Sequence, residues 1–188
     1  MTMTTQPQNR AFTVGEYYSM AEADILTEED RVELIAGQIV AMSPIGSRHA
    51  ACVKRLNLLM GKMVQDSLLI GVQDPIQLDA YSAPEPDLVL LRPRADFYAA
   101  AHPSAADVLL AIEVADTSAD YDREVKLPLY AQAGIPEVWL IDLQAGHIEM
   151  YARPQGDAYQ QRVEVTADAT LTSPTIPQLA LAAADLLG

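Results

Sequence analysis

Apolar and polar positions repeat along this chain with two periods, one typical of helices and one typical of strands. In residues 47–67, apolar side chains recur at three- and four-residue steps, which predicts an amphipathic helix. Residues 121–133 predict a second helix that ends at Gly134. Pro128 must either kink this helix or mark its true first turn, because proline is costly deeper in a helix. A capping-box pattern opens a shorter helix over residues 13–23.

Strands are predicted where apolar positions alternate or form short continuous runs. These segments are residues 31–35, 38–42, 69–73, 76–78, 88–91, 107–115, 137–142, 147–152 and 159–165. The first two predict a β-hairpin, and the last two predict a closing antiparallel pair. Residues 107–115 and 137–142 are so apolar that they predict central strands covered on both faces. The middle of the chain thus reads helix, three strands, helix, strand, which predicts an α/β (α+β) sandwich with a mixed sheet.

Length and composition favour one globular domain. The chain has 188 residues, of which 50% are hydrophobic, and this excludes intrinsic disorder. We expect a flexible arm over residues 1–12 and a single domain over residues 13–188. Cys52 is the one cysteine, so the chain cannot form an intramolecular disulfide. Because no apolar stretch suits a signal peptide or a membrane span, we expect a cytoplasmic protein with no membrane partner.

The charge balance narrows the possible partners. Twelve basic and 26 acidic residues give a formal net charge of −14. A charge of this sign repels phosphate backbones at long range, which argues against a protein that coats DNA non-specifically. It does not exclude an enzyme that meets nucleic acid through a local basic patch and a bound metal.

Several common catalytic motifs are missing from the sequence. The three histidines are far apart and lack the spacing of a zinc site. No glycine-rich nucleotide-binding loop occurs, and no G-x-S-x-G nucleophile elbow occurs either. Because these motifs are absent, the carboxylates are the remaining candidates for a catalytic or metal-binding site.

Three carboxylates stand at positions whose neighbours are apolar. Glu113 interrupts the most hydrophobic predicted strand, Asp87 opens the neighbouring strand, and Glu33 lies in the early hairpin. Burial of an unpaired charge is costly, so a cation is expected to hold these acids together. A hard divalent ion such as Mg²⁺ or Mn²⁺ suits oxygen ligands best. The alternative is three separate solvated or salt-bridged carboxylates.

Lys126 is a fourth candidate. Asp122, Lys126 and Tyr130 follow one another at four-residue spacing and therefore share a helix face. This face could be an ordinary surface stripe. If the helix covers the sheet, Lys126 can reach the carboxylates, where it could position a water or stabilise a phosphoryl transition state.

Four segments together resemble a known protein family. Residues 32–40, 86–89, 112–118 and 126–142 are similar to the Uma family of restriction-endonuclease-like proteins in the PD-(D/E)XK nuclease superfamily. The likeness extends over roughly residues 13–185. It implies a restriction-endonuclease-like αβββαβ core with a mixed central sheet, preceded by the β-hairpin and followed by the antiparallel strand pair.

The resemblance also implies roles for individual residues. Asp87 matches the acid of the Pro-Asp motif, and Glu113 matches the acid of the (D/E)-X-K motif. Ala115 stands where the motif lysine is expected, and Lys126 fits the helical position to which family members move it. Glu33 matches an additional family acid. The implied ligands of Mg²⁺ (or Mn²⁺) are Asp87, Glu113 and the Val114 carbonyl.

We therefore expect a metal-dependent endonuclease that hydrolyses phosphodiester bonds, with DNA as its nucleic-acid partner and a homodimer as its assembly. The alternative is a nuclease-fold module with little catalysis that acts in nucleic-acid binding or protein assembly; RNA or another phosphate ester also stays open as substrate. Candidate phosphate contacts are Arg48, His49, Lys54, Arg55, Arg92, Arg94 and Arg123. Candidate supporting residues are Ser118, Asp122 and Tyr130.

Overall fold

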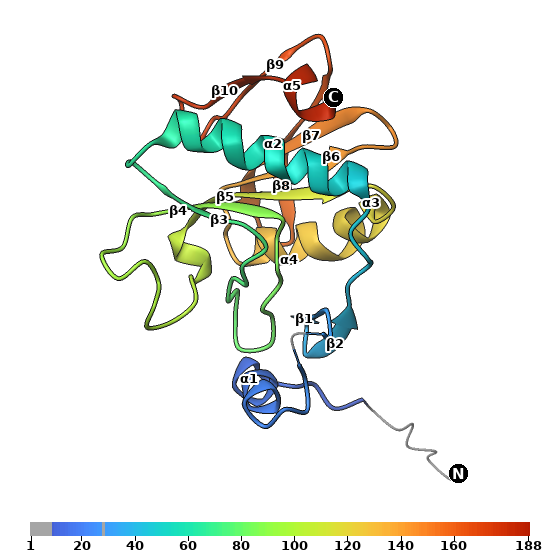
Figure 1. Ribbon diagram of the computed structural model, residues 1–188, viewed down its shortest axis with the longest axis vertical. Coiled ribbons are helices and arrows are strands. Elements are labelled where there is room, and N and C mark those ends of the chain that lie inside the picture. Colours follow the sequence, from blue (N-terminus) through green and yellow to red (C-terminus); the bar gives the residue numbers. More distant parts are fainter. Residues whose placement is uncertain (1–8, 28) are drawn as a thin grey trace.

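A six-stranded sheet forms the centre of the computed structural model, which describes residues 9–27 and 29–188 (Figure 1). Its strand order is β3-β4-β5-β6-β7-β8. The strands are β3 (Leu69–Gly71), β4 (Leu88–Leu91), β5 (Val108–Ala115), β6 (Glu137–Asp142), β7 (His147–Gln155) and β8 (Ala158–Thr166). β5 and β6 run parallel, whereas the other neighbouring pairs of this sheet run antiparallel. The predicted mixed sheet is confirmed.

Helices cover both faces of this sheet. The helical segments of the described residues are α1 (Val14–Glu22), α2 (Ser47–Val64), the 3₁₀ turn η1 (Ala105–Asp107), α3 (Ala119–Tyr121), the π-helical turn η2 (Asp122–Lys126), α4 (Leu127–Gln132) and α5 (Ala184–Leu187), of which α1 lies away from the sheet. In Figure 1, α2 crosses one face and α4 lies on the other. The parallel connection from β5 to β6 passes through α3, η2 and α4. The helix predicted at 121–133 thus starts earlier, and Pro128 lies in the first turn of α4.

Strand alternation decides which side chains meet which helix. Leu88, Leu90 and Ile112 pack in the cluster that contains the apolar side chains of α2. Val89 and Ala111 pack in the cluster that contains the buried residues of α4. Because side chains two residues apart on a strand point to the same face, the odd-numbered positions near the end of β5 face α4. Glu113 is one of these positions.

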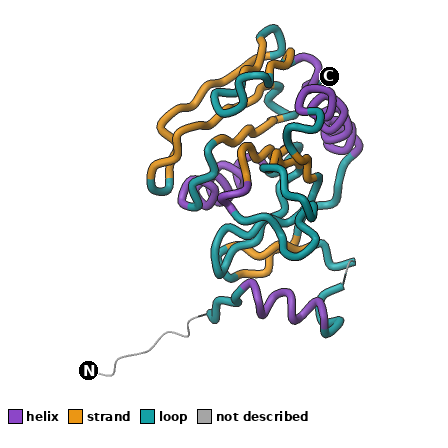
Figure 2. Tube along the Cα trace, turned by 90° about the vertical axis from the view of Figure 1, so that its left-hand side faces the viewer, coloured by secondary structure: helices purple, strands orange, loops and turns teal. Residues whose placement is uncertain are grey.

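The predicted hairpin is confirmed as β1 (Val32–Ile35) and β2 (Gln38–Ala41). Its turn needs Gly37, which has φ +76° and comes so close to the preceding chain that an added Cβ would lie 2.5 Å from the Cβ of Ala11. The predicted capping box opens α1, which packs on the hairpin through Leu34. In both views, α1 and the hairpin lie at the opposite end of the molecule from the C-terminus (Figures 1 and 2).

Two sequence predictions need correction or restriction. The strand predicted at 76–78 is wrong: the Ile76 and Leu78 amides donate to Pro84 and Ser82 carbonyls, which closes a local loop instead of extending the sheet. The predicted arm, 1–12, falls mostly outside the described residues, although the Phe12 amide donates to the Gly37 carbonyl at 2.9 Å.

The C-terminal segment completes the fold beside α2. β9 (Thr170–Thr172) and β10 (Ala180–Ala182) form a separate antiparallel pair, and their buried residues join the core cluster of α2. Across the described ranges, the helices lack the length and apolar character that crossing a membrane requires.

Candidate functional site

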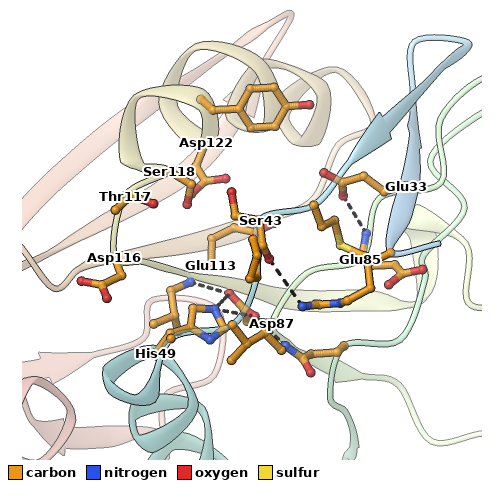
Figure 3. Close-up of a pocket in the computed structure, with 18 of the residues that line it drawn as sticks. Glu33, Ser43, His49, Glu85, Asp87, Glu113, Asp116, Thr117, Ser118 and Asp122 are labelled. Atoms are coloured by element: carbon orange, nitrogen blue, oxygen red, sulfur yellow. Dashed lines mark hydrogen bonds and ion pairs between the residues drawn. The ribbon is translucent and has the colours of Figure 1, made fainter. Parts of the chain in front are cut away.

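A cavity of about 470 Å³ lies where the β1–β2 hairpin meets the central sheet, beside the start of β4 and the end of β5. Its wall contains all four predicted catalytic residues: Glu33 from β1, Asp87 just before β4, Glu113 from β5 and Lys126 from η2. The first three are labelled in Figure 3. None of the four is more than 9% exposed. Four segments that are far apart in the sequence therefore meet at one cavity.

Asp87 is held on two sides. Its Oδ2 accepts a hydrogen bond from the Val114 amide at 2.9 Å, which ties it to the adjacent strand. The Nε2 of His49, from α2, lies 3.0 Å from the carboxylate, and the Gln73 side-chain amide donates to Oδ1 at 3.2 Å. The hydrogen bond to Asp87 raises the pKa of His49, against the opposing effect of burial. These contacts fix the direction of the Asp87 carboxylate.

Glu113, Lys126 and Glu33 form a chain of buried charges. The ammonium of Lys126 lies 3.3 Å from Oε1 of Glu113 and 3.0 Å from Oε2 of Glu33. The Tyr130 hydroxyl donates to the same Glu113 oxygen at 2.5 Å, and the Glu85 amide donates to Glu33 at 3.1 Å. One cation thus bridges two carboxylates that come from different sheets.

The position of Lys126 follows from the local fold. Leu88 pairs with Ile112, so the antiparallel register carries Asp87 towards Glu113. Ala115, on the same face as Glu113, is fully buried and carries no charge. The ammonium comes instead from η2, which crosses this face of the sheet. Single π-helical turns often occur at functional sites, because the wider turn redirects side chains.

Buried acidic side chains dominate the electrostatics of the cavity. Burial raises the pKa of Glu113 well above its usual value, with Lys126 opposing and the charges of Asp122 and Asp87 adding to the shift. Burial likewise raises the pKa of Asp122 to about 6. Burial alone would lower the pKa of Lys126, but the carboxylates of Glu113 and Glu33 outweigh it and raise that pKa. Lys126 is therefore cationic at every physiological pH.

The three predicted supporting residues also gather here. Ser118 and Asp122 line the cavity, and the Ser118 hydroxyl donates to Asp122 at 2.9 Å. Tyr130 is fully buried beneath Glu113. The helix-face argument for Asp122, Lys126 and Tyr130 therefore places all three beside the carboxylates, although η2 is not an α-helical turn.

The candidate phosphate contacts are spread more widely. His49 lines the cavity, and Arg48 lies beside it, where it pairs with Asp116 at 3.3 Å and donates to the Leu143 carbonyl. The other candidates lie outside the cavity lining. Lys54 is exposed on α2, whereas Arg55 and Arg92 donate to the backbone carbonyls of Leu186 and Ala106, respectively. Arg94 and Arg123 are engaged in ion pairs, Arg94 with Asp96 and Arg123 with Asp120, Asp142 and Glu149. Their phosphate-binding role stays a prediction.

Several lining residues were missed by the sequence reasoning, among them Arg31, Gln73, Glu85 and Tyr121. Glu85 stands two residues before Asp87 and could have been suspected from that proximity. Gln73 lies in a connection with φ +56°, and no periodicity marks it. Neither pattern nor charge singles out Arg31 or Tyr121, so their place in the site required the fold.

The donor set fits a hard divalent cation. Mg²⁺ is commonly held by one or two carboxylates and keeps several waters, so Asp87 and Glu113 with the Val114 carbonyl supply suitable oxygen ligands. Within the part of the chain that the structure describes, no three or more His, Cys, Asp or Glu side chains gather as a ready-made metal cluster. A site that relies on a few carboxylates and water is compatible with this arrangement, whereas an all-protein cage is not.

Comparisons with known proteins agree with the architecture. The family model Uma2, described as "Putative restriction endonuclease", matches residues 14–184. No curated protein gives a significant match. The crystal structure of a "putative nuclease belonging to DUF820" from Anabaena variabilis ATCC 29413 has a TM-score of 0.72 and 17% sequence identity, over 94% of this chain and 97% of that chain. At this identity the likeness establishes a shared fold, and the extent of the family match shows that the chain belongs to the Uma2 family of restriction-endonuclease-like proteins.

Proposed function

We propose that this protein is a divalent-metal-dependent nuclease that hydrolyses phosphodiester bonds in DNA. The observation that carries the proposal is the meeting of Asp87, Glu113 and Lys126 in one cavity. Buried acids with raised pKa values beside a charge partner in a cleft are typical of functional sites. Membership of a family described as restriction endonucleases supports the same chemistry.

In this proposal, Lys126 acts as a fixed positive charge. Because neighbouring carboxylates raise its pKa, it keeps its proton and does not serve as a general base. Its ammonium can donate to a non-bridging phosphate oxygen as negative charge develops during attack by water on phosphorus. Tyr130 and Glu33 position the two ends of the Glu113–Lys126 pair. Glu113 and Lys126 are then catalytic residues, and Tyr130 and Glu33 are positioning residues.

Asp87 and Glu113 would hold Mg²⁺ or Mn²⁺ together with the Val114 carbonyl. When bound, such an ion supplies positive charge that polarises the phosphodiester and favours ionisation of water. The hydrogen bonds of Asp87 to Val114, His49 and Gln73 keep its carboxylate in one orientation before any ligand arrives. Preorganisation of this kind lowers the reorganisation needed during reaction.

The test is cleavage of plasmid DNA with Mn²⁺ or Mg²⁺, compared with EDTA. Cleavage should require the metal and should be lost in Asp87→Asn and Glu113→Gln. Glu164→Gln, an exposed glutamate of β8, is the matched control and should cleave as wild type does. Undiminished cleavage by Glu113→Gln would overturn the proposed site. The predicted homodimer is a separate question, which sedimentation of the purified protein answers.

A second candidate function follows from the net charge of −14. Duplex binding draws much of its affinity from Lys and Arg contacts to phosphates, and this chain has few. A nuclease-fold module that acts in assembly, with little catalysis, would account for that charge. It predicts no hydrolysis under any metal condition.

A further inference from the structure

The depth of the reacting groups limits what can reach them. Glu33, Asp87, Glu113 and Lys126 are at most 9% exposed and line a cavity whose volume is about 470 Å³. That size is in the range of small-molecule pockets, about 300–1,000 Å³. Because these groups are recessed in the cavity wall, a phosphodiester has to enter the cavity with its own nucleotide to reach them.

The cavity lining is not purely polar. Besides the acids and Lys126, β2 and the segment between β2 and α2 contribute apolar side chains, Val40, Met42, Pro44 and Ile45, which we call the apolar side. Ile45 is 42% exposed, so its side chain is accessible to a ligand that enters the cavity. Apolar surface beside a few polar groups suits the flat face of a base or the carbon face of a sugar.

Cations are scarce around this cavity. Among the described lining residues, six carboxylates accompany two permanent cations, Arg31 and Lys126. Lys126 is already shared by two acids, and nearby Arg48 is paired with Asp116. Proteins that grip duplex DNA typically neutralise about 6–10 phosphates with Lys and Arg. The surroundings of this cavity provide no comparable set.

We propose that the cavity selects an unpaired nucleotide, from a single strand or a frayed end, over intact duplex; this rests on the proposed nuclease function. An unpaired nucleotide can turn into the cavity at little cost. A nucleotide in a duplex must first be unstacked and unpaired, which costs a few kcal/mol and favours single-stranded substrates. Because the described cavity lining lacks a set of Lys and Arg side chains that could offset this cost, duplex DNA enters the cavity poorly.

The experiment compares short fluorescein-labelled oligonucleotides of one sequence as a single strand, a blunt duplex and a duplex with an internal bubble, all with Mn²⁺. Methyl p-nitrophenyl phosphate, a phosphodiester without a base, is assayed in parallel. The single strand and the bubble should be cleaved at least about 10-fold faster than the blunt duplex. Fluorescence anisotropy with Ca²⁺ in place of Mn²⁺ should show the same order of affinity.

The apolar side is tested by Ile45→Ala. This variant should reduce kcat/KM for the single strand by about 10-fold, the lower end of the effect of a lost methylene contact, because Ile45 is partly exposed. Leu58→Ala, at an exposed apolar position of α2 outside the cavity lining, is the matched control and should leave the single-strand rate unchanged.

The outcomes distinguish a failure of the substrate inference from a failure of the proposed nuclease function. Hydrolysis of the small phosphodiester together with equal or faster cleavage of blunt duplex overturns the substrate inference and leaves the nuclease intact. An unchanged single-strand rate in Ile45→Ala overturns the role of the apolar side. No hydrolysis of any substrate overturns the proposed function, and the inference with it.

Discussion

Two buried glutamates on the same face of the central sheet have opposite electrostatic surroundings. Glu113 pairs with Leu140, and Leu140 pairs with Glu149, so both acids lie in one row across β5, β6 and β7. The side chains are 6% and 1% exposed, respectively. The short turn η2 serves both, because Lys126 reaches Glu113 and Arg123 reaches Glu149. Similar burial and a shared helical turn make the two sites directly comparable.

Their partners make the difference. Glu149 accepts hydrogen bonds from Arg123, Arg162 and Tyr151 and contacts His147. Burial alone would raise its pKa, but the hydrogen bonds of Tyr151, Arg123 and His147 outweigh burial and lower the pKa to about 2.

Glu113 has one cation, shared with Glu33, and burial raises its pKa. A satisfied buried acid contributes to stability, whereas an undersatisfied one is costly and is better explained by ligand binding. The comparison supports the proposed catalytic role of Glu113 and indicates a structural role for Glu149.

The largest expected effect is on catalysis at the Glu113 end of η2. Lys126→Met should reduce kcat/KM for phosphodiester hydrolysis by about 10²- to 10³-fold, as the loss of one preorganised charge donor does elsewhere. Rates are measured per folded protein, with folding checked by circular dichroism. Lys62→Met, at an exposed lysine of α2, is the control. Wild-type activity in Lys126→Met would remove Lys126 from the mechanism.

The next effect is on stability at the Glu149 end. Glu149→Gln leaves Arg123 and Arg162 without their central partner and should lower the free energy of unfolding by about 2–3 kcal/mol. This is less than the 3–5 kcal/mol typical of a fully buried pair, because both arginines keep contact with solvent. Urea denaturation measures the loss, and activity per folded molecule should stay within about two-fold of wild type. Lost activity with wild-type stability would reverse the assignment.

Acid should erase the stabilising effect of Glu149. Its pKa is about 2 in the folded protein and about 4.3 in an unfolded chain, so its contribution is present above the unfolded value and is lost as the pH falls towards 2. The stability difference between wild type and Glu149→Gln should therefore shrink by about 2 kcal/mol between pH 5 and pH 2.5. A constant difference across this range would mean that the carboxylate charge contributes nothing.

The smallest effect concerns positioning. Tyr130→Phe removes the hydroxyl that donates to Glu113 and should lower kcat by about 10-fold, in line with one hydrogen bond to a charged group, with little change in KM. Steady-state kinetics on methyl p-nitrophenyl phosphate separates the two constants. Tyr81→Phe, at an exposed tyrosine outside the cavity lining, is the control. A change confined to KM would indicate a role in binding instead.

Much of the fold was predictable because burial imposes periodicity on the sequence. The helix face of α2 and the hairpin turn at Gly37 followed from local pattern, and Glu113 stood out because a charge interrupts an apolar strand. The prediction for residues 76–78 was wrong because two apolar positions around a polar one fit a strand and a buried loop equally well. Short apolar segments carry no signal that distinguishes the two.

The tertiary contacts of individual side chains were harder to predict than the helices and strands. The sequence suggested Arg123 as a phosphate contact, yet its salt bridges to Glu149 and Asp142 depend on strand register that no local pattern encodes. Gln73 and Glu85 join the site through connections whose course is set by packing. Lys126 was a candidate from its helical spacing with Asp122 and Tyr130, and the family resemblance supported it, since Ala115 occupies the motif position.

Thermal denaturation with EDTA and with Mn²⁺ tests the assignment of Glu113 to function most directly. Binding to the native state alone adds about 2.7 kcal/mol at a hundredfold excess over Kd, which should raise the wild-type Tm by about 5–10 °C. Glu113→Gln should abolish the Mn²⁺ shift and, because Lys126 keeps Glu33 as a partner, should lower the metal-free Tm less than Glu149→Gln does. Glu149→Gln should lower the metal-free Tm and keep the shift. A large loss of metal-free stability in Glu113→Gln, with no Mn²⁺ response in the wild type, would contradict the account.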